Sequence, residues 1–293
     1  MNKHFLVTVS NDYEHLTGVE FLCSFFKQRS KHQITLLHIC RLDSTIAKNA
    51  LLEIWENPDD RVKGKLTVGA KKAMDKSIAM LKDSSMSIDE MITKTFAERY
   101  GKVKDILNEG SSGLYDAIVL GKRASYTLQW FFERPADETA KAIISDSSIS
   151  TPIWICPAPE KGRKNVLICV DGSEGSLRAV DHAGYILSKQ DQHNLTLLYV
   201  ENGAGLNSEE IFNKSKNTLK EHNIDPGRIR TETTWGLNVA GTILSFAEKG
   251  AFAAIAVGLK GVDKGIMKRI NLAGGTTASL IERTEKISLW CCP

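Results

Sequence analysis

One stretch near the end of the sequence carries residue types that suit the binding of a phosphate. It contains four glycines and two adjacent threonines: Gly258, Gly261, Gly274, Gly275, Thr276 and Thr277. An apolar run, residues 251–257, precedes it and is typical of a strand buried on both faces of a parallel sheet. A helical pattern, residues 277–283, follows it. Glycine lets the backbone approach a ligand closely, and unpaired N–H groups at a helix start attract an anion.

The same stretch adds positive charge, since it also holds four basic residues: Lys260, Lys264, Lys268 and Arg269. Its spacing matches neither the GxxxxGK[ST] loop nor the GxGxxG fingerprint. Glycines also end strands in α/β folds that bind nothing, and lysines on loops are often simply solvated. The stretch therefore predicts a phosphate-binding loop, with a plain connecting loop as the alternative.

A carboxylate follows another apolar run earlier in the chain. Asp171-Gly172-Ser173 comes directly after residues 166–170. A carboxylate at the carboxyl end of a strand can accept hydrogen bonds from a base or a sugar, and ligands of open α/β sheets bind at that edge. Ser173 is also a predicted helix N-cap, and a role for Asp171 in the turn alone would explain its type.

Length and composition exclude several classes of protein. The 293 residues are comfortable for two domains, and 42% hydrophobic with 25% charged residues is ordinary for a globular protein. A net charge of +3 argues against nucleic acid or an anionic membrane as partner. We find neither a signal-peptide core nor an apolar run near the ~20 residues that span a bilayer. We therefore expect a cytoplasmic protein.

The cysteines give no sign of a metal or redox site. The six are Cys23, Cys40, Cys156, Cys169, Cys291 and Cys292, and none belongs to a CxxC pair or to a Cys/His cluster with zinc spacing. Four of them lie in or beside apolar runs, so we expect small buried side chains that stay reduced.

The sequence repeats itself with a constant offset. The strand-like run that begins at Phe5 matches the one at Val166, and the run at Ile34 matches the one at Leu195. Both pairs are 161 residues apart. An offset that holds over two elements indicates one fold written twice.

This repeat divides the chain into a first domain, residues 1–157, a linker, 158–163, and a second domain, 164–293. Strand and helix patterns alternate in each half. The fold class is therefore α/β, with two doubly wound domains of five parallel strands and four helices each.

Several local elements are predicted as well. In the second half we expect helices over residues 207–222 and from residue 239 to 246, with a strand over 229–233. In the first half Asp12 is the candidate cap of the first helix. Residues 42–88 exceed the matching span of the second half and hold two helix patterns, about 47–56 and 69–82. These helices form a surface insertion, or they cover a site or a partner face.

The order, spacing and duplication of these motifs resemble a tandem-domain universal stress protein. The second half has Val170-Asp171-Gly172-Ser173 after its first strand, Leu197 to Val200 in its second, and Val257-Gly258-x-x-Gly261 before a Gly/Thr turn. The resemblance covers nearly the whole chain. It implies five-stranded domains of the adenine nucleotide alpha hydrolase-like type, domain pairing within the chain partly through the last strands, and a cytoplasmic role in stress survival. A homodimer is an expectation from the family alone.

Some members of that family bind ATP through an Asp after the first strand, a Val in the second, and a G-x2-G-x9-G-[ST] loop. For this chain the resemblance implies a site for ATP or a related adenine nucleotide in the second half only, with Mg²⁺ as an open addition. Its residues would be Asp171, Gly172, Ser173, Val200, Gly258, Gly261, Gly274, Gly275, Thr276 and Thr277.

The sequence departs from that pattern in both halves. Residues 262–273 make the second-half loop longer than the family spacing. In the first half Ser10 replaces the Asp, Ala124 replaces a glycine, and Ala136-Asp137 replaces Gly274-Gly275 and is followed by Glu138. Two carboxylates there would repel a phosphate, and the basic residues Lys122, Arg123 and Arg134 offset them only in part, so we interpret the first site as degenerate.

The same first-half loop holds Trp130-Phe131-Phe132. These rings pack into their own domain, or they seal the empty site or form an interface.

Three functions compete. We expect a regulatory stress-response protein that binds a nucleotide in its second half. The alternative is an interaction module without a nucleotide, and the third is an adenylating or phosphoryl-transfer enzyme. We find no convincing base, nucleophile or metal constellation, and one carboxylate, Asp171, is too few ligands for a dedicated magnesium site. We therefore expect no enzyme, with slow ATP hydrolysis left open.

Overall fold

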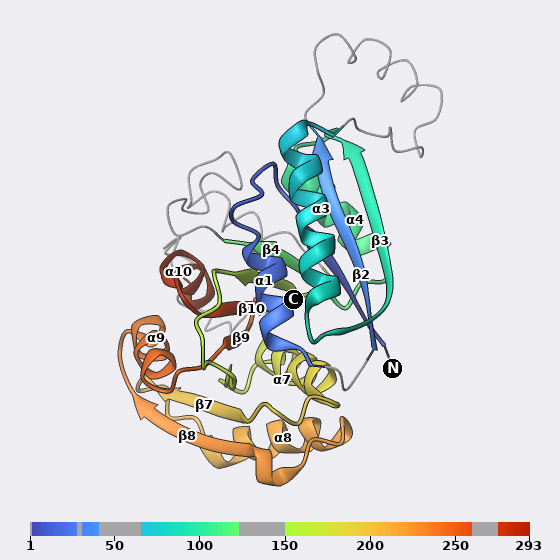
Figure 1. Ribbon diagram of the computed structural model, residues 1–293. Helices are drawn as coiled ribbons and strands as arrows, with labels where there is room; N and C mark the ends of the chain where they lie inside the picture. The colour runs from blue at the N-terminus through green and yellow to red at the C-terminus, as the bar shows by residue number, and fades with distance from the viewer. Residues whose placement is uncertain (1, 28–30, 41–65, 123–149, 260–274) are drawn as a thin grey trace.

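A computed structural model describes residues 2–27, 31–40, 66–122, 150–259 and 275–293 of the chain (Figure 1). The strands of the first half are β1 (Lys3–Thr8), β2 (Lys31–Cys40), β3 (Ser87–Ala97), β4 (Ala117–Gly121) and β5 (Ile153–Cys156). Its helices in the described ranges are α1 (Thr17–Phe25), α3 (Val68–Asp83) and α4 (Lys102–Ser112). The expected fourth helix, near residues 138–144, lies outside the described residues.

The second half repeats this order. Its strands are β6 (Val166–Cys169), β7 (Leu195–Glu201), β8 (Ile229–Trp235), β9 (Ala254–Gly258) and β10 (Ser288–Cys292). Its helices are α7 (Glu174–Leu187), α8 (Ser208–Glu221), α9 (Val239–Lys249) and α10 (Thr276–Arg283), with a short 3-10 turn, η1 (Pro226–Arg228), before β8.

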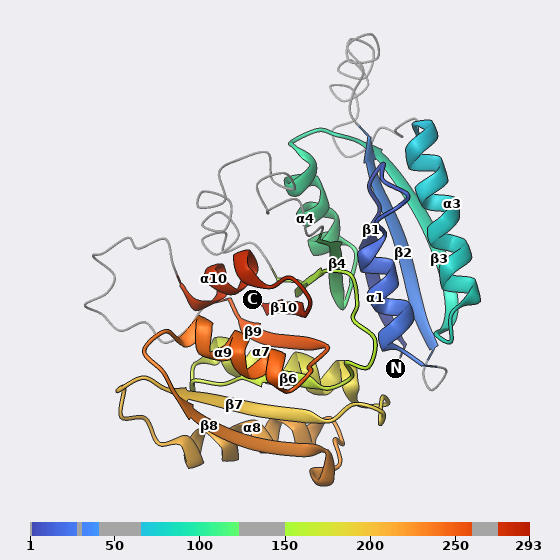
Figure 2. The same ribbon diagram turned by 60° about the vertical axis from the view of Figure 1, so that its left-hand side comes forward.

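All ten strands form one sheet in the order β3-β2-β1-β4-β5-β10-β9-β6-β7-β8. Every neighbouring pair is parallel except β5 and β10, which meet antiparallel at the centre. The predicted α/β fold with five parallel strands in each half is therefore confirmed. Figure 2 shows the blue-to-green half and the yellow-to-red half on either side of this central pair.

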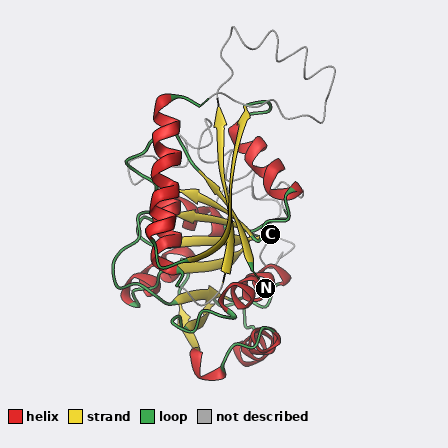
Figure 3. Cartoon of the chain, turned by 45° about the vertical axis from the view of Figure 1, so that its right-hand side comes forward, coloured by secondary structure: helices red, strands yellow, loops and turns green. Residues whose placement is uncertain are grey.

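The sheet is covered by helices on both faces, which Figure 3 shows with the strands in yellow between the helices in red. Successive strand residues alternate between two apolar cores: Val166 and Ile168 join the core under α1, α3, α7 and α8, whereas Leu167 joins the core under α4, α9 and α10. This period of two explains why the strands are apolar runs without polar alternation.

Most predicted elements are confirmed within a residue or two. Helix α8 lies between the cap residues Asn207 and His222, and the side chain of Asn207 accepts hydrogen bonds from the first turn. Helix α3 takes the place between its neighbouring strands that α8 takes in the second half, so it belongs to the repeat. The extra length falls in residues 41–65 and, with the pattern at 47–56, lies outside the described residues.

The prediction that Asp12 caps the first helix is wrong. Helix α1 begins at Thr17 and its N-cap position is Leu16, which makes no side-chain cap bond. The carboxylate of Asp12 instead accepts a hydrogen bond from the N–H of Glu14 and contacts His15, so it stabilises a turn that delays the helix by one turn.

The two halves meet through a pair of stacked tryptophans. Trp154 of β5 and Trp290 of β10 occupy equivalent positions in the repeat and are directly paired in the antiparallel ladder. Their rings are 4.2 Å apart and nearly parallel, at 6°, and neither side chain is exposed. Because each residue contacts its own counterpart, a pseudo-twofold axis passes between the rings, as in an isologous dimer interface.

The hydrogen bonding around this axis is asymmetric. The indole N–H of Trp154 donates to Nε2 of His182 on α7, at 3.0 Å. The residue 161 positions before His182 is Phe21, which offers no acceptor. Among the described residues the buried indole N–H of Trp290 has no partner.

A lysine of the first half binds a helix of the second. Nζ of Lys122, directly after β4, donates to the carbonyl oxygens of Ile281 at 2.7 Å and Thr284 at 2.6 Å, with Glu282 at 3.4 Å. These carbonyls belong to the C-terminal end of α10, where a cation is favourable. The ammonium group of Lys122 is therefore held at the end of α10, across the junction of the two halves.

The cysteines are free and mostly buried, as expected. Burial raises the pKa of Cys156 and of Cys291 to about 12, so these thiols stay protonated at neutral pH. No helix in the described part of the chain is both long and apolar enough to cross a bilayer.

The bond from Trp154 to His182 is testable by a double-mutant cycle. With Trp154→Phe and His182→Phe, which keep rings at both positions, we expect a coupling free energy of about 1 kcal/mol in urea unfolding. The control is the cycle of Trp290→Phe with His182→Phe, because these rings are 6.0 Å apart without a hydrogen bond. Equal coupling in the two cycles would contradict the assignment.

Burial should also make stability depend on pH through His182. Burial, and next the charge of Lys3, lower the pKa of His182 from 6.5 to about 3. The unfolded chain then binds a proton that the folded chain refuses, so stability falls as the pH drops from 6.5 toward 3.

His182→Gln keeps an acceptor for Trp154 but cannot titrate. In urea unfolding between pH 6 and pH 4, the stability of the wild type relative to this variant should fall by about 1.4 kcal/mol per pH unit. The other buried histidines titrate in both proteins and cancel. If the stability difference between wild type and variant stays constant with pH, the pKa of His182 is not lowered in the folded protein.

Candidate functional site

The predicted site residues gather at one edge of the sheet. Strands β9, β6 and β7 are adjacent in the sheet and parallel, so their carboxyl ends lie together. Asp171 follows the end of β6, Val200 lies at the end of β7, and Gly258 is the last residue of β9. In open α/β sheets this edge is where ligands bind.

Asp171 is held by the turn that starts α7. Its Oδ1 accepts hydrogen bonds from the backbone N–H of Ser173 at 3.0 Å and from the hydroxyl of Ser173 at 2.6 Å. Between them Gly172 adopts a φ of +81°, a conformation that favours glycine. In the described residues Oδ2 of Asp171 has no protein partner, so one carboxylate oxygen is available to a ligand.

Ser173 is the N-cap of α7, as predicted. Its hydroxyl oxygen accepts a hydrogen bond from the N–H of Ser176 at 3.1 Å. Because the same hydroxyl donates to Asp171, both of its hydrogen-bonding functions are used within the turn. Ser173 therefore positions Asp171 and offers little to a ligand directly.

Gly258 lies where the starts of two helices meet. A Cβ on this residue would be 2.4 Å from the backbone carbon of Gly175 in the first turn of α7. Its carbonyl oxygen accepts a hydrogen bond from the hydroxyl of Thr277 in the first turn of α10, at 2.9 Å. The positive ends of two helix dipoles thus converge on the end of β9.

The start of α10 is open. Its N-cap is Gly275, which supplies no side-chain cap, and a Cβ there would meet no atom within 4 Å. Gly275 and Thr276 are exposed, whereas Thr277 is buried against Gly258. The first N–H groups of α10 can therefore bind an anion in the way that helix starts do.

Several predicted groups cannot be placed. Gly261, Gly274 and the four basic residues of the loop lie outside the described residues. Val200 is described, and its side chain is buried in the core under α9 and α10. Its backbone at the end of β7 is therefore the part that could contact a ligand.

Sequence reasoning missed two exposed apolar side chains at the same edge. Trp235, the last residue of β8, is 66% exposed, and Leu237 is 77% exposed. Trp235 pairs in register with Glu201 of β7, next to Val200. An aromatic residue directly before Gly236 at the end of a strand was the available signal, because it places a large ring at the ligand edge.

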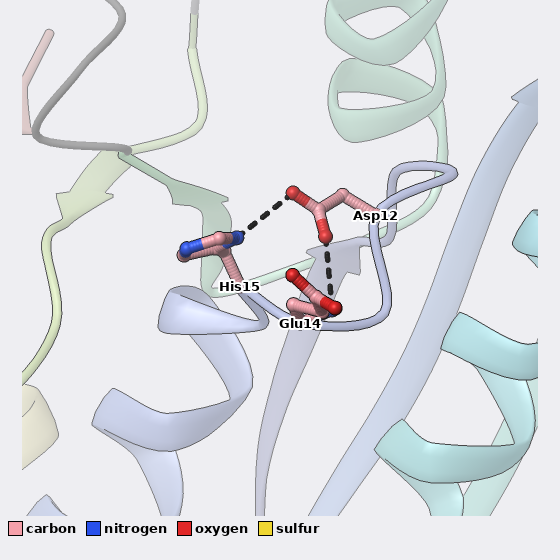
Figure 4. Close-up of side chains that lie close together, drawn as sticks. All are labelled: Asp12, Glu14 and His15. Carbon is pink, nitrogen blue, oxygen red and sulfur yellow. Dashed lines mark hydrogen bonds and ion pairs between the residues drawn. The ribbon is translucent and has the colours of Figure 1, made fainter.

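The corresponding turn of the first half is built differently. Asp12 bonds to Glu14 and His15 there, as Figure 4 shows. The side chains of these three residues offer ligand atoms within 4.8 Å of one another. Glu14 and His15 are exposed, and the turn and an ion pair account for the arrangement.

Helix α3 also packs against this first-half turn. The hydroxyl of Thr67 donates to the side chain of Asn11 at 3.1 Å, and a Cβ on Gly69 would be 2.9 Å from the Asn11 carbonyl oxygen. Ser10, at the position of Asp171, brings no carboxylate. Ala124, Ala136, Asp137 and the aromatic run at 130–132 lie outside the described residues, so the degenerate first site stays a prediction.

Gly258→Ala tests how closely the strand and the two helices meet. The new Cβ would clash with backbone, which cannot rotate away, so we expect a loss of about 1–3 kcal/mol in urea unfolding. Gly275→Ala is the matched control and should cost distinctly less, because its Cβ meets no atom. Similar losses for the two variants would contradict this geometry.

Comparisons with known proteins find related folds among solved structures. No protein-family model and no curated protein matches the chain. A candidate universal stress protein from Pseudomonas aeruginosa UCBPP-PA14 matches 99% of this chain and 93% of its own, with 14% identity and a TM-score of 0.45. The cytoplasmic domain of a prokaryotic cation chloride cotransporter matches 99% and 95%, with 11% identity and a TM-score of 0.47.

A shorter match covers a single repeat. A universal stress protein in complex with cAMP matches 44% of this chain and 95% of its own, with 21% identity and a TM-score of 0.36. Universal stress proteins are among the solved structures that match this chain.

Proposed function

We propose that the chain is a tandem-domain universal stress protein whose second half binds ATP or a related adenine nucleotide as a regulatory ligand. The observation that carries the proposal is the end of β9, where Gly258 lies between the starts of α7 and α10. Two helix dipoles and open N–H groups at one point suit a phosphate.

The other groups of this edge suit the rest of a nucleotide. The free oxygen of Asp171 can accept hydrogen bonds from a ribose or a base. The exposed ring of Trp235 offers an apolar surface at the same edge, two strands away. Among the described residues of the edge we identify neither a general base nor a nucleophile, so we propose binding without turnover. Mg²⁺, if it binds, would be held here by the free carboxylate oxygen of Asp171.

The proposal also includes the arrangement of the chain. The antiparallel pairing of β5 with β10 supports two halves that act as paired domains within one chain. A conformational change on ligand binding in one half would then reach the junction of β5 with β10. Association of two chains and a cytoplasmic location belong to the proposal only as expectations from the family.

A second candidate function is an interaction module without a nucleotide. It is favoured by the internal roles of the predicted ligand groups: Asp171 holds Ser173, Gly258 accommodates α7, and Thr277 bonds to Gly258. In this case Trp235 and Leu237 would contact a partner protein.

The two candidates are distinguished by ligand identification. Native mass spectrometry of protein purified without added nucleotide, repeated with ATP and with cAMP in the presence of Mg²⁺, should give one adenine nucleotide per chain. Asp171→Ala should weaken binding by about tenfold or more, because it removes a hydrogen bond to a charged group.

Two further variants sharpen the test. Asp171→Asn keeps the acceptor for Ser173 and separates the loss of charge from the loss of the turn. Ser10→Ala, at the equivalent position of the first half, is the control and should bind as the wild type does. Two nucleotides per chain would refute the single site, and no binding at all would favour the interaction module.

A further inference from the structure

A cavity of about 410 Å³ lies at the junction of the two halves, away from the nucleotide edge. Its walls are α1 of the first half, the linker at 159–163, second-half residues just before β6, β7, β9 and β10, and the first residue of β10. The size falls within the range of small-molecule pockets. Phe21 and Phe25 contribute apolar surface to it.

The repeat supplies an internal reference for this cavity. Three residues of its lining are Ser24, Lys164 and Ala253. Lys164 and Ser24 correspond to Lys3 and Tyr185 at the offset of 161 residues. Ala253 corresponds to Asp116, because the N–H of each donates to an equivalent carbonyl, that of Asn165 and that of His4 respectively, at 2.8 Å.

At the equivalent place on the other side of the pseudo-twofold axis, side chains of the protein fill the space. The ammonium group of Lys3 lies 2.9 Å from the centre of the Tyr185 ring, across the junction of the halves. The carboxylate of Asp116 lies close to both groups, because its charge acts on the pKa of Lys3 and on that of Tyr185. A lysine, an aromatic ring and a carboxylate thus occupy this side of the pseudo-twofold axis, and Lys3 is only 4% exposed.

On the cavity side only the lysine is retained. Ser24 replaces the aromatic ring, and Ala253 replaces the carboxylate. The two missing groups are the two parts of an aromatic acid. We therefore propose that the cavity binds a small aromatic carboxylic acid, with its ring beside Ser24 and its carboxylate near Lys164.

The charges around the cavity agree with an anionic ligand. Five basic side chains line it, and Glu160 is the one acid. Glu160 and Glu248 already bind Arg163, so that guanidinium is neutralised within the protein. Lys27, Lys161 and Lys164 make no ion pair with any described carboxylate, which leaves their ammonium groups to attract a ligand.

Gln192, which also lines the cavity, has an unpaired polar atom. Oε1 of Gln192 is buried and has no hydrogen-bond partner among the described residues. Its amide nitrogen is held by the carbonyl of Phe25 and by the side chain of Gln190. A hydroxyl on the aromatic ring could donate to Oε1 and relieve the cost of the unpaired acceptor.

The probe for this proposal is 2-naphthoate, with 2-naphthamide as the neutral ligand of the same shape. In isothermal titration calorimetry at low salt, we expect one naphthoate per chain and at least about tenfold weaker binding of the amide, since exposed ion pairs contribute up to about fivefold each. Naphthoate binding should weaken as salt is added.

The decisive variant is Ser24→Tyr, which installs the ring of the counterpart from an exposed position on α1 and should abolish naphthoate binding without unfolding the protein. Lys164→Gln should weaken binding about fivefold. Lys216→Gln, on the exposed face of α8, is the matched charge control and should change nothing.

The proposal does not depend on nucleotide binding, so Asp171→Ala should bind naphthoate as the wild type does. Equal affinity for naphthoate and naphthamide would overturn it, because the lysines would then not recognise the charge. Unchanged binding by folded Ser24→Tyr, or no naphthoate binding up to millimolar concentration, would overturn it as well.

Discussion

The stacked pair of Trp154 and Trp290 is the constraint on which the rest of the structure depends. It fixes the antiparallel register of β5 and β10, and through that register it makes one sheet of ten strands from two sheets of five. Since both rings are fully buried, the helices on that face of each half must close over the junction. Large aromatic surfaces of this kind dominate the energetics of cores and interfaces.

Around this axis the two halves have the same backbone arrangement and differ in their side chains. His182 in one half corresponds to Phe21 in the other, so the indole N–H of Trp154 is bonded and that of Trp290 has no partner in the part of the chain that the structure describes. Tyr185 corresponds to Ser24, so one side of the junction is filled and the other is hollow. A duplicated fold can therefore keep one geometry while its chemistry diverges at single positions.

Much of the fold could be predicted because the signals were local and repeated. Apolar runs gave the strands, and the constant offset between the Phe5 and Val166 strands gave the second domain. The cap at Ser173 was predictable from residue type, but the same reasoning failed at Asp12, because its carboxylate bonds to Glu14 and does not cap α1. The junction cavity depends on which residues of the two halves meet, and no local pattern carries that information.

The ammonium group of Lys122 has a consequence for where one half ends and the other begins. Helix α10 starts at the open glycine edge of the second half, yet its last carbonyls are bound by a side chain of the first. The last carbonyls of α10 therefore depend on Lys122, a residue that precedes the linker by more than thirty positions. The linker at 158–163 separates the two halves in the sequence, but hydrogen bonds still join them. A second half cut out at the linker would therefore expose the last carbonyls of α10 to water.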